Sequence, residues 1–469
     1  MVGIPMKDLD FVVRVQLRMA LACLVLALLG GAASVLHYLP AASSWLNAHD
    51  LTMPRVRPVH TTFVTLWIYG AGVAMVYAWM ARDGGGLRRG DLVRFKLHTL
   101  CWITAGLGIF VTALLGVSSG REYLEFHPAF AVPLLLGWVL FAWSFWKRAF
   151  VGFWSRPVYV YMWTVGTCLF VYAFVEAHVW LLPGVGDRPL RDLQLQWKSC
   201  GTLVGSFNFM VYGTIAYLRE RISGETTPGQ SRWAFALFGV GCLNSFTNYV
   251  HHTYHVPQDV TAKWIAFLVS MAEIVILWRV LGDVVASLRS EAPRHPALRF
   301  MASARNWNLV SLTLAIVISV PPWNAVIHGT HAVAAHAMGA EIGIDSMALF
   351  AAVSWLLLQR HPERQAALTV PGRLRALNFA AGALVGWLFV VGVANGWTRY
   401  HGEVPPQWVT SAFWVFPVLG GTFALLLLGL VARWWGLLRQ EASSAATVEP
   451  AEAGAPAPAG SWMGEPARH

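Results

Sequence analysis

The sequence predicts an all-α polytopic membrane protein with about twelve transmembrane helices. Of its 469 residues, 56% are hydrophobic and only 12% are charged, which is far from the balance of a soluble domain. The apolar residues also gather in stretches long enough to cross a bilayer. Because a helix satisfies its own backbone hydrogen bonds in lipid, helices are the expected spanning elements.

Each expected span is an apolar run of roughly membrane length, followed by a more polar connection. In order they are 15–39, 60–81, 97–118, 129–146, 157–182, 196–218, 232–254, 259–281, 306–325, 329–358, 374–396 and 408–432. After the last span the chain becomes rich in Ala, Pro, Glu and Gly, a composition that cannot bury a core. We therefore expect one membrane domain over residues 1–440 and a disordered cytoplasmic tail over residues 441–469.

Lys and Arg gather in alternate loops. The segments rich in Lys and Arg are both termini and the loops 82–96, 147–156, 219–232, 283–305 and 359–375. The positive-inside rule then places both termini in the cytoplasm, in a multi-pass protein of a bacterial inner membrane. The first apolar run is too long for a cleaved signal peptide and lacks a small-residue cleavage pattern. The net charge of +10 thus reflects membrane orientation, and no nucleic-acid partner is expected.

The five cysteines are widely spaced and all fall in apolar segments. This pattern excludes a zinc framework and a Cys-x-x-Cys-His haem-attachment site. Any haem would therefore be held without covalent bonds, by axial ligands.

His336 and Met338 stand two positions apart inside the tenth expected span. At about 100° per residue their side chains leave the helix in nearly opposite directions, so one helix could hold two haem irons. Other side chains of the ligand type fall at a similar depth near the outer face: His60, Cys200, His251 and His252. A single boundary histidine is more often a capping residue, and a buried cysteine is more often a small hydrophobe. The combination of these residues at one depth therefore carries the prediction.

Four motifs show a resemblance to a known family. They are Val-His-Thr-Thr-Phe-Val-Thr-Leu-Trp at 59–67, Gly-Arg-Glu-Tyr-Leu-Glu at 120–125, His-His at 251–252 and His-Gly-Thr-x5-His at 328–336. They resemble the large, catalytic subunit of cytochrome c-dependent nitric oxide reductase, over nearly the whole chain and in the family's order. The resemblance implies the haem-copper oxidase superfamily and its subunit I arrangement of about twelve helices.

The resemblance implies two haems b. His60 would be one axial ligand of a low-spin haem, and His336 would be the axial ligand of a high-spin, gas-binding haem. The family has a second histidine two positions after the latter, where this chain has Met338. Thioether ligation is the weaker of the two and raises the reduction potential of a haem.

The resemblance also implies two metal sites and a proton donor. A non-haem metal, iron or copper, would be held by Cys200, His251 and His252, although the family has a histidine at the cysteine position. Glu122 and the backbone near Gly120 match the family's calcium site, whose oxygen ligands suit that ion. Glu273 matches a glutamate beside the metal centre and is the candidate for proton delivery. The structural alternative for it is a buried acid paired with a polar neighbour.

A further departure affects the expected reaction. Asn208 stands where the family has a glutamate near the non-haem metal. The loss of this carboxylate weakens the case for ordinary nitric oxide reduction. Oxygen-reducing relatives place a tyrosine about two turns before the histidine pair. This chain reads Leu-Asn-Ser-Phe-Thr-Asn at 243–248, without a tyrosine, so oxygen is the weaker candidate for the substrate.

We therefore expect a haem oxidoreductase of the respiratory or denitrifying type that reduces NO to N2O. Its electrons would come from a small membrane-anchored cytochrome c subunit or another periplasmic donor. Two alternatives stay open. One is a divergent sibling with other gas chemistry, such as NO disproportionation, O2 reduction or NO sensing. The other is a non-enzymatic membrane carrier.

Overall fold

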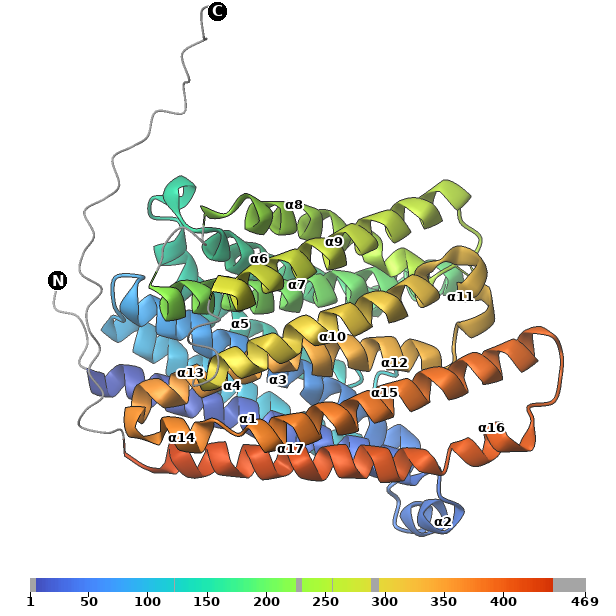
Figure 1. Cartoon of the computed structure of the whole chain (residues 1–469). Helices are drawn as coiled ribbons and strands as arrows, with labels where there is room; N and C mark the ends of the chain where they lie inside the picture. The colour runs from blue at the N-terminus through green and yellow to red at the C-terminus, as the bar shows by residue number, and fades with distance from the viewer. Residues whose placement is uncertain (1–5, 122, 225–229, 255, 288–294, 442–469) are drawn as a thin grey trace, which may run out of the picture.

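Long helices run side by side through the computed structural model, which describes residues 6–121, 123–224, 230–254, 256–287 and 295–441 (Figure 1). All regular elements of these residues are helices, as the sequence predicts. The start of α1 and the end of α17 lie at one end of the bundle, here called the inner end. The short helices α11 and α16 lie at the opposite, outer end (Figure 1). The expected tail, apart from residue 441, lies outside the described residues.

The long helices are α1 (Met6–Leu36), α3 (Met53–Arg82), α4 (Arg89–Leu114), α5 (Ala131–Ala149), α6 (Val158–Glu176), α7 (Pro189–Ser223), α8 (Arg232–Thr247), α9 (Val260–Ser287), α10 (Pro296–Ser319), α12 (His331–Ala340), α13 (Met347–Arg360), α15 (Pro371–Tyr400) and α17 (Val415–Arg439). Short elements connect them: α2 (Pro40–Ala48), η1 (Pro128–Phe130), η2 (Phe153–Ser155), η3 (Val179–Leu181), η5 (Asn248–His252), α11 (Pro321–Ile327), η6 (Glu341–Ser346), η7 (Pro362–Arg364), α14 (Gln365–Leu368) and α16 (Gln407–Ala412).

All twelve expected spans coincide with helices, but they are not equally apolar. Within the described residues, nine helical stretches are long and apolar enough to cross a membrane, and α10 with α11 makes a tenth. The other two expected spans fall on α7 and α8. Helix α7 has 35 residues but carries charged and amide side chains in its first turns. Helix α8 ends at Thr247, so the expected span 232–254 is too long as an α-helix and continues as the 3-10 turn η5.

Helix α3 forms the centre of the bundle, with 94% of its most apolar window buried. Small residues on α1 let the two helices approach closely. A Cβ atom on Gly31 would lie only 2.8 Å from the Nδ1 atom of His60. The glycine therefore allows this histidine to lie directly against α1.

The outer end of α10 is fixed by a sharp bend, at which α11 turns by 89°. Pro321 and Pro322 follow Val320, and proline cannot continue the hydrogen-bond ladder of a preceding helix. Asn324 donates hydrogen bonds to the carbonyl oxygens of Ile318, at 2.7 Å, and His251, at 3.1 Å. The bend is therefore tied to the turn η5 that carries the histidine pair.

Helices α12 and α13 form one span of 30 residues, His331–Arg360, interrupted by the π-helical turn η6. Gly343 in this turn lies against α10, where an added Cβ would meet the ring of Trp307 at 2.5 Å. A π turn contains one more residue than an α turn, and such turns are frequent at functional sites.

Candidate functional site

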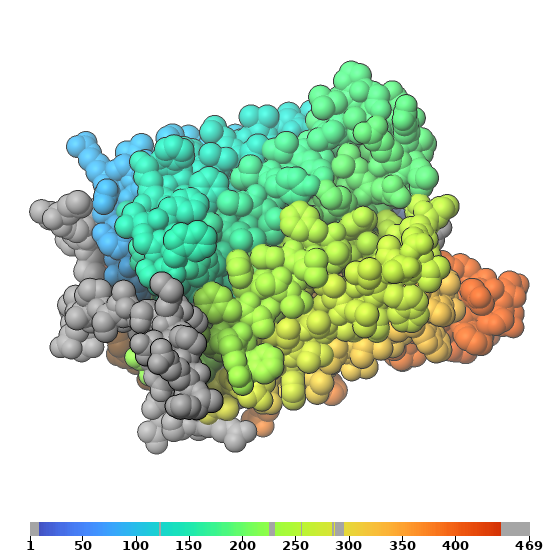
Figure 2. Space-filling view, turned by 90° about the horizontal axis from the view of Figure 1, so that it is seen from above, coloured from blue at the N-terminus to red at the C-terminus, as the bar shows by residue number. Residues whose placement is uncertain are grey.

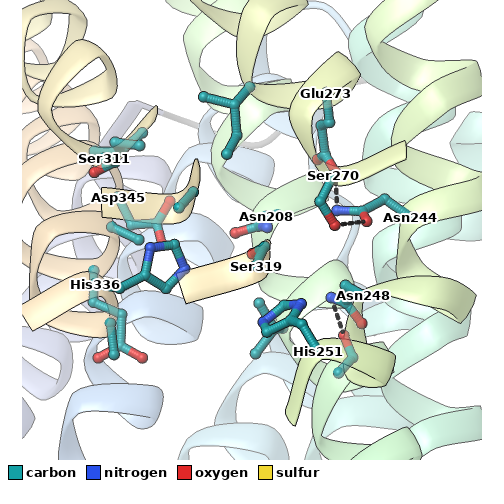
Figure 3. A pocket seen from close by; sticks show the side chains of 18 of the residues that line it. Asn208, Asn244, Asn248, His251, Ser270, Glu273, Ser311, Ser319, His336 and Asp345 are labelled. Atoms are coloured by element: carbon teal, nitrogen blue, oxygen red, sulfur yellow. Dashed lines mark hydrogen bonds between the residues drawn. The ribbon is translucent and has the colours of Figure 1, made fainter. Parts of the chain in front are cut away.

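A cavity of about 150 Å³ lies between α7, α8, η5, α9, α10 and α12 with η6 (Figure 3). Helices α8 and α9 lie on the face of the molecule shown in Figure 2 and form the wall of the cavity on that side. Five of the sequence-predicted site residues line the cavity: Cys200, His251, His252, Glu273 and His336. Residues from four separate segments therefore meet here. Of the residues predicted to share one depth, His60 and Met338 are not among those that line the cavity.

His336 on α12 and His251 on η5 face each other across this cavity (Figure 3). Their ring centroids are 6.5 Å apart and the rings are nearly perpendicular, at 89°. In each ring the Nδ1 atom is buried and has no hydrogen-bond partner in the described part of the chain. A buried, unsatisfied nitrogen is costly. Two such imidazoles that face each other across a cavity fit metal ligands better than they fit a packed core.

Trp197 connects Cys200 and His252, which line the same cavity. The indole of Trp197 stacks on the ring of His252 at 4.7 Å and 3°, and the rings of His251 and His252 are 4.2 Å apart. Trp197 and Cys200 are three residues apart on α7 and so share a face. Asn248 also ties η5 to α7, because its side chain donates to the carbonyl of Gly201 at 3.1 Å.

The three predicted metal ligands thus share one cavity, and a thiolate with two imidazoles suits iron, copper or zinc. In the described segments, however, no three His, Cys, Asp or Glu side chains already lie at the spacing that holds an ion. The ligand set Cys200, His251 and His252 therefore stays a prediction.

Glu273 is only 4% exposed and belongs to a polar network in the cavity wall. It accepts a hydrogen bond from the side-chain amide of Asn244, and Ser270 donates to the same amide at 2.8 Å. The acid is therefore paired with polar neighbours and also faces the cavity, so the structural and functional interpretations are compatible. Asn208 also lines the cavity, close to the two facing histidines in the view of Figure 3, so the departure from the family glutamate falls inside the cavity.

His60 is oriented by α1 and lies outside this cavity. Its Nδ1 atom pairs with the carbonyl oxygen of Ala27 at 2.8 Å. A carbonyl partner on one ring nitrogen fixes the tautomer and leaves Nε2 with the lone pair that a metal needs. Met338 is partly buried against the main core and also lies outside the cavity, so the pairing of these two residues stays a prediction.

His331 lies seven residues before Met338 and thus on the same helix face, outside the cavity. Its Nε2 atom pairs with the hydroxyl of Tyr38 at 2.7 Å, and its ring packs against Phe413 and Phe416. These contacts hold it in the core, so it serves as a histidine of the same helix without a proposed ligand role.

The loop between α4 and η1 carries the predicted calcium site. Glu122 lies outside the described residues, so its role stays a prediction. Gly120 has a φ of +68°, in the left-handed region that favours glycine. Tyr123 follows with a φ of 60° and lines the cavity. The loop therefore reaches the candidate site whichever ion it binds.

Glu125 fixes the same loop to α3 and was missed at the sequence level, although it ends the quoted motif. It is 3% exposed, pairs with Arg57 and accepts a hydrogen bond from the hydroxyl of Thr61 at 2.5 Å. These two partners flank His60 on α3. The loop thus braces the helix turn that carries a predicted haem ligand.

The comparisons with known proteins agree with this arrangement. The model of the cytochrome C and quinol oxidase polypeptide I family matches residues 12–423. The chain is also similar to a solved structure described as "Cryo-EM structure of a heme-copper terminal oxidase dimer provides insights into its catalytic mechanism". The TM-score is 0.71, with 17% sequence identity over 96% of this chain and 88% of that chain, a likeness of fold. No curated protein matches the chain significantly.

Proposed function

Since the chain belongs to the cytochrome C and quinol oxidase polypeptide I family, it is a haem-dependent membrane oxidoreductase of the haem-copper oxidase superfamily, and we propose that it reduces nitric oxide to nitrous oxide. The observation that supports a gas-reducing centre most directly is the facing pair His336 and His251, with buried, unpartnered ring nitrogens. The motifs at 59–67, 120–125 and 328–336 favour NO as the gas.

The proposed cofactors are two haems b, one non-haem iron or copper ion, and Ca²⁺ near Gly120 and Glu122. His60 and Met338 would hold the low-spin haem, and His336 the high-spin haem. Cys200, His251 and His252 would hold the non-haem metal. Bound at these residues, the haem and metal would supply two sites for the gas and a Lewis acid.

The protein side chains supply orientation and protons. Trp197 fixes the ring plane of His252 by stacking. The carbonyl of Ala27 holds the tautomer of His60. Glu273 lies in the cavity wall with Asn244 and Ser270 as polar partners, within a network that can pass a proton to the site. The net reaction joins two NO with two electrons and two protons to give N2O and water.

We propose that the electron donor is a small membrane-anchored cytochrome c subunit or another periplasmic carrier, and that both termini are cytoplasmic. The second candidate function is other gas chemistry at the same centre. Asn208 favours it, because the nitric oxide reductases have a carboxylate where this chain has an amide in the lining of the cavity. Oxygen reduction is the weaker case, since the segment 243–248 contains no tyrosine.

Gas turnover by the purified protein tests the proposal. With a chemical electron mediator and NO, we expect one N2O for every two NO consumed, measured with an NO electrode and gas chromatography. Anaerobic release of O2 together with N2 would instead indicate disproportionation. Consumption of O2 without consumption of NO would contradict the proposed reaction and place the chain with the oxygen-reducing relatives.

Cys200 decides whether the cavity holds a second metal. In the variant Cys200→Ala, loss of the thiolate ligand should lower the non-haem metal content by at least about tenfold, while the haem content stays unchanged. Elemental analysis by mass spectrometry together with haem spectra measures both quantities. The variant Cys200→His, which restores the family's ligand type, should regain the metal. Equal metal content in Cys200→Ala and the unmodified protein would make this cysteine a bystander.

A further inference from the structure

Two acids, Glu341 and Asp345, occur in the same span as His336 but have no role in the proposed haem and metal sites. Both lie on the π-helical turn η6 and both line the cavity. Asp345 is only 3% exposed. Ionisable residues deep in a membrane segment are costly and usually functional, so this pair needs an explanation.

The acids lie deeper in the bundle than the predicted ligands. Asp345 follows His336 by nine residues, which corresponds to about 13 Å along a helix axis. On the neighbouring helices, Tyr212 lies 12 residues after Cys200 and Asn308 lies 11 residues before the outer end of α10, equivalent to about 18 and 16 Å. All three line the same cavity. The cavity therefore extends from the histidines toward the middle of the membrane and ends in polar side chains.

A second observation indicates that water binds here. The Oδ1 atom of Asn308 and the hydroxyl of Ser311 belong to side chains that are 0% and 1% exposed, and neither atom has a hydrogen-bond partner within the described ranges. Both residues line the cavity from α10. A buried polar atom left unsatisfied is costly, and a water molecule with two to four polar partners removes that cost.

The hydroxyl of Ser311 lies beside the stretch of α12 that joins His336 to the acids. The hydroxyl of Ser311 would be 3.4 Å from a Cβ added to Gly339, which stands between His336 and Glu341 in the chain. Figure 3 shows Ser311 and Asp345 on the same side of the cavity as His336. A water held by Ser311 would therefore lie between the acids and the histidine end, and one held by Asn308 would lie one helix turn deeper.

The negative charge of the carboxylates in this part of the cavity has to be reduced by protonation. Asp345 has Glu341 and Glu273 as its electrostatic neighbours, and the described lining contains no Lys or Arg. Three carboxylates cannot all be ionised at low cost in such a place. At least one of them therefore holds a proton that it can give up.

We propose that Glu341 and Asp345, with waters bound by Asn308 and Ser311, form a proton-donating site for gas reduction at the His336 end of the cavity. The inference rests on the proposed function. The acid that holds the proton gives it through the waters to the oxygen atom that leaves as water, a proton from bulk water replaces it, and the second proton follows the same route. The electrons come separately, from the one-electron donor, so the two protons and two electrons of the net reaction are accounted for.

Proton uptake tests this site independently of turnover. The purified protein is reduced fully in weak buffer, and a pH-indicator dye counts the protons that are taken up. The reduced-minus-oxidised infrared spectrum records carboxylic acid C=O stretching. In Asp345→Asn, uptake should fall by at most about one proton per chain, the part of this site that is ionised before reduction, and the carboxylic acid band of Asp345 should disappear. The visible haem spectrum and CO binding should be unchanged.

Three further variants make the result specific. Glu341→Gln should also lower the proton uptake on reduction. If Asp345→Asn fails to assemble, this variant tests the proton-donating site in its place. Asp345→Glu should restore both signals. Glu363→Gln changes an exposed acid at the inner end and should behave as the unmodified protein. NO reduction should slow on the order of 10²-fold in Asp345→Asn and recover in Asp345→Glu.

The outcomes separate the two proposals. If Asp345→Asn and Glu341→Gln keep the full proton uptake and infrared bands with haem intact, the proton-donating site is wrong. If the unmodified protein takes up protons on reduction and the variants lose them, but NO is not turned over, the site stands and NO reduction fails.

Discussion

Replacing His336 with alanine should remove the CO-binding haem and leave the other haem in place. The reason is that the high-spin haem is expected to have this imidazole as its only protein ligand, whereas the low-spin haem keeps His60 and Met338. Reduced-plus-CO difference spectra should lose their signal, the haem content should fall by about half, and NO reduction should fall on the order of 10³-fold or more.

His331→Ala is the matched control for this prediction. It removes a histidine from the same helix, five residues earlier, whose ring pairs with the hydroxyl of Tyr38. We expect both haems to remain in this variant. Retention of the CO signal in His336→Ala would contradict the assignment, and loss of the signal in both variants would indicate that the helix itself, and not one ligand, was disturbed.

Replacing Met338 with histidine should lower the reduction potential of the low-spin haem. A thioether opposite an imidazole stabilises ferrous iron, as in cytochromes c, so a second imidazole should shift the midpoint downward by on the order of 10² mV. Spectroscopic redox titration measures the shift, and the CO-binding haem serves as the internal reference because its ligand is unchanged.

Met338→Leu separates ligation from packing in this experiment. It keeps an apolar side chain of similar size but removes the sulfur, so the low-spin haem should become five-coordinate or be lost. An unchanged midpoint and spectrum in both variants would show that Met338 is part of the core and that the second ligand is a different residue.

The sequence predicts the fold well because hydropathy reports which segments lie in lipid. It fails where a span is polar or broken for local reasons. Helix α8 stops at Thr247 and gives way to a 3-10 turn, a change that no apolar pattern marks. The 89° turn into α11 has a clear signal in Pro321 and Pro322, but a hydropathy window averages over it.

In the candidate site, too, some residues could be predicted from the sequence and others could not. His336, His251, His252, Cys200 and Glu273 are ligand or acid types in apolar segments, and the structure brings them to one cavity. Glu341 and Asp345 were equally visible as acids in a span, yet their relation to the cavity depends on the π turn and on the approach of Gly343 to Trp307. Such an approach is a tertiary contact, which the local sequence does not encode.

The fixed orientation of His60 is likewise a product of packing. It depends on Gly31 of α1 and on the carbonyl of Ala27, about thirty residues away in the chain. The sequence identified the histidine as a ligand type, but only the structure shows which of its nitrogens is free to bind a metal.

The most direct test of a two-metal gas-reducing centre is the cofactor content of the purified protein. Reduced-minus-oxidised and CO-difference spectra should be recorded beside iron and copper analysis by mass spectrometry. We predict two b-type haems per chain, one of them binding CO, and one further iron or copper atom. Two haems without the extra metal would contradict the two-metal centre, and a protein without haem would overturn the account as a whole.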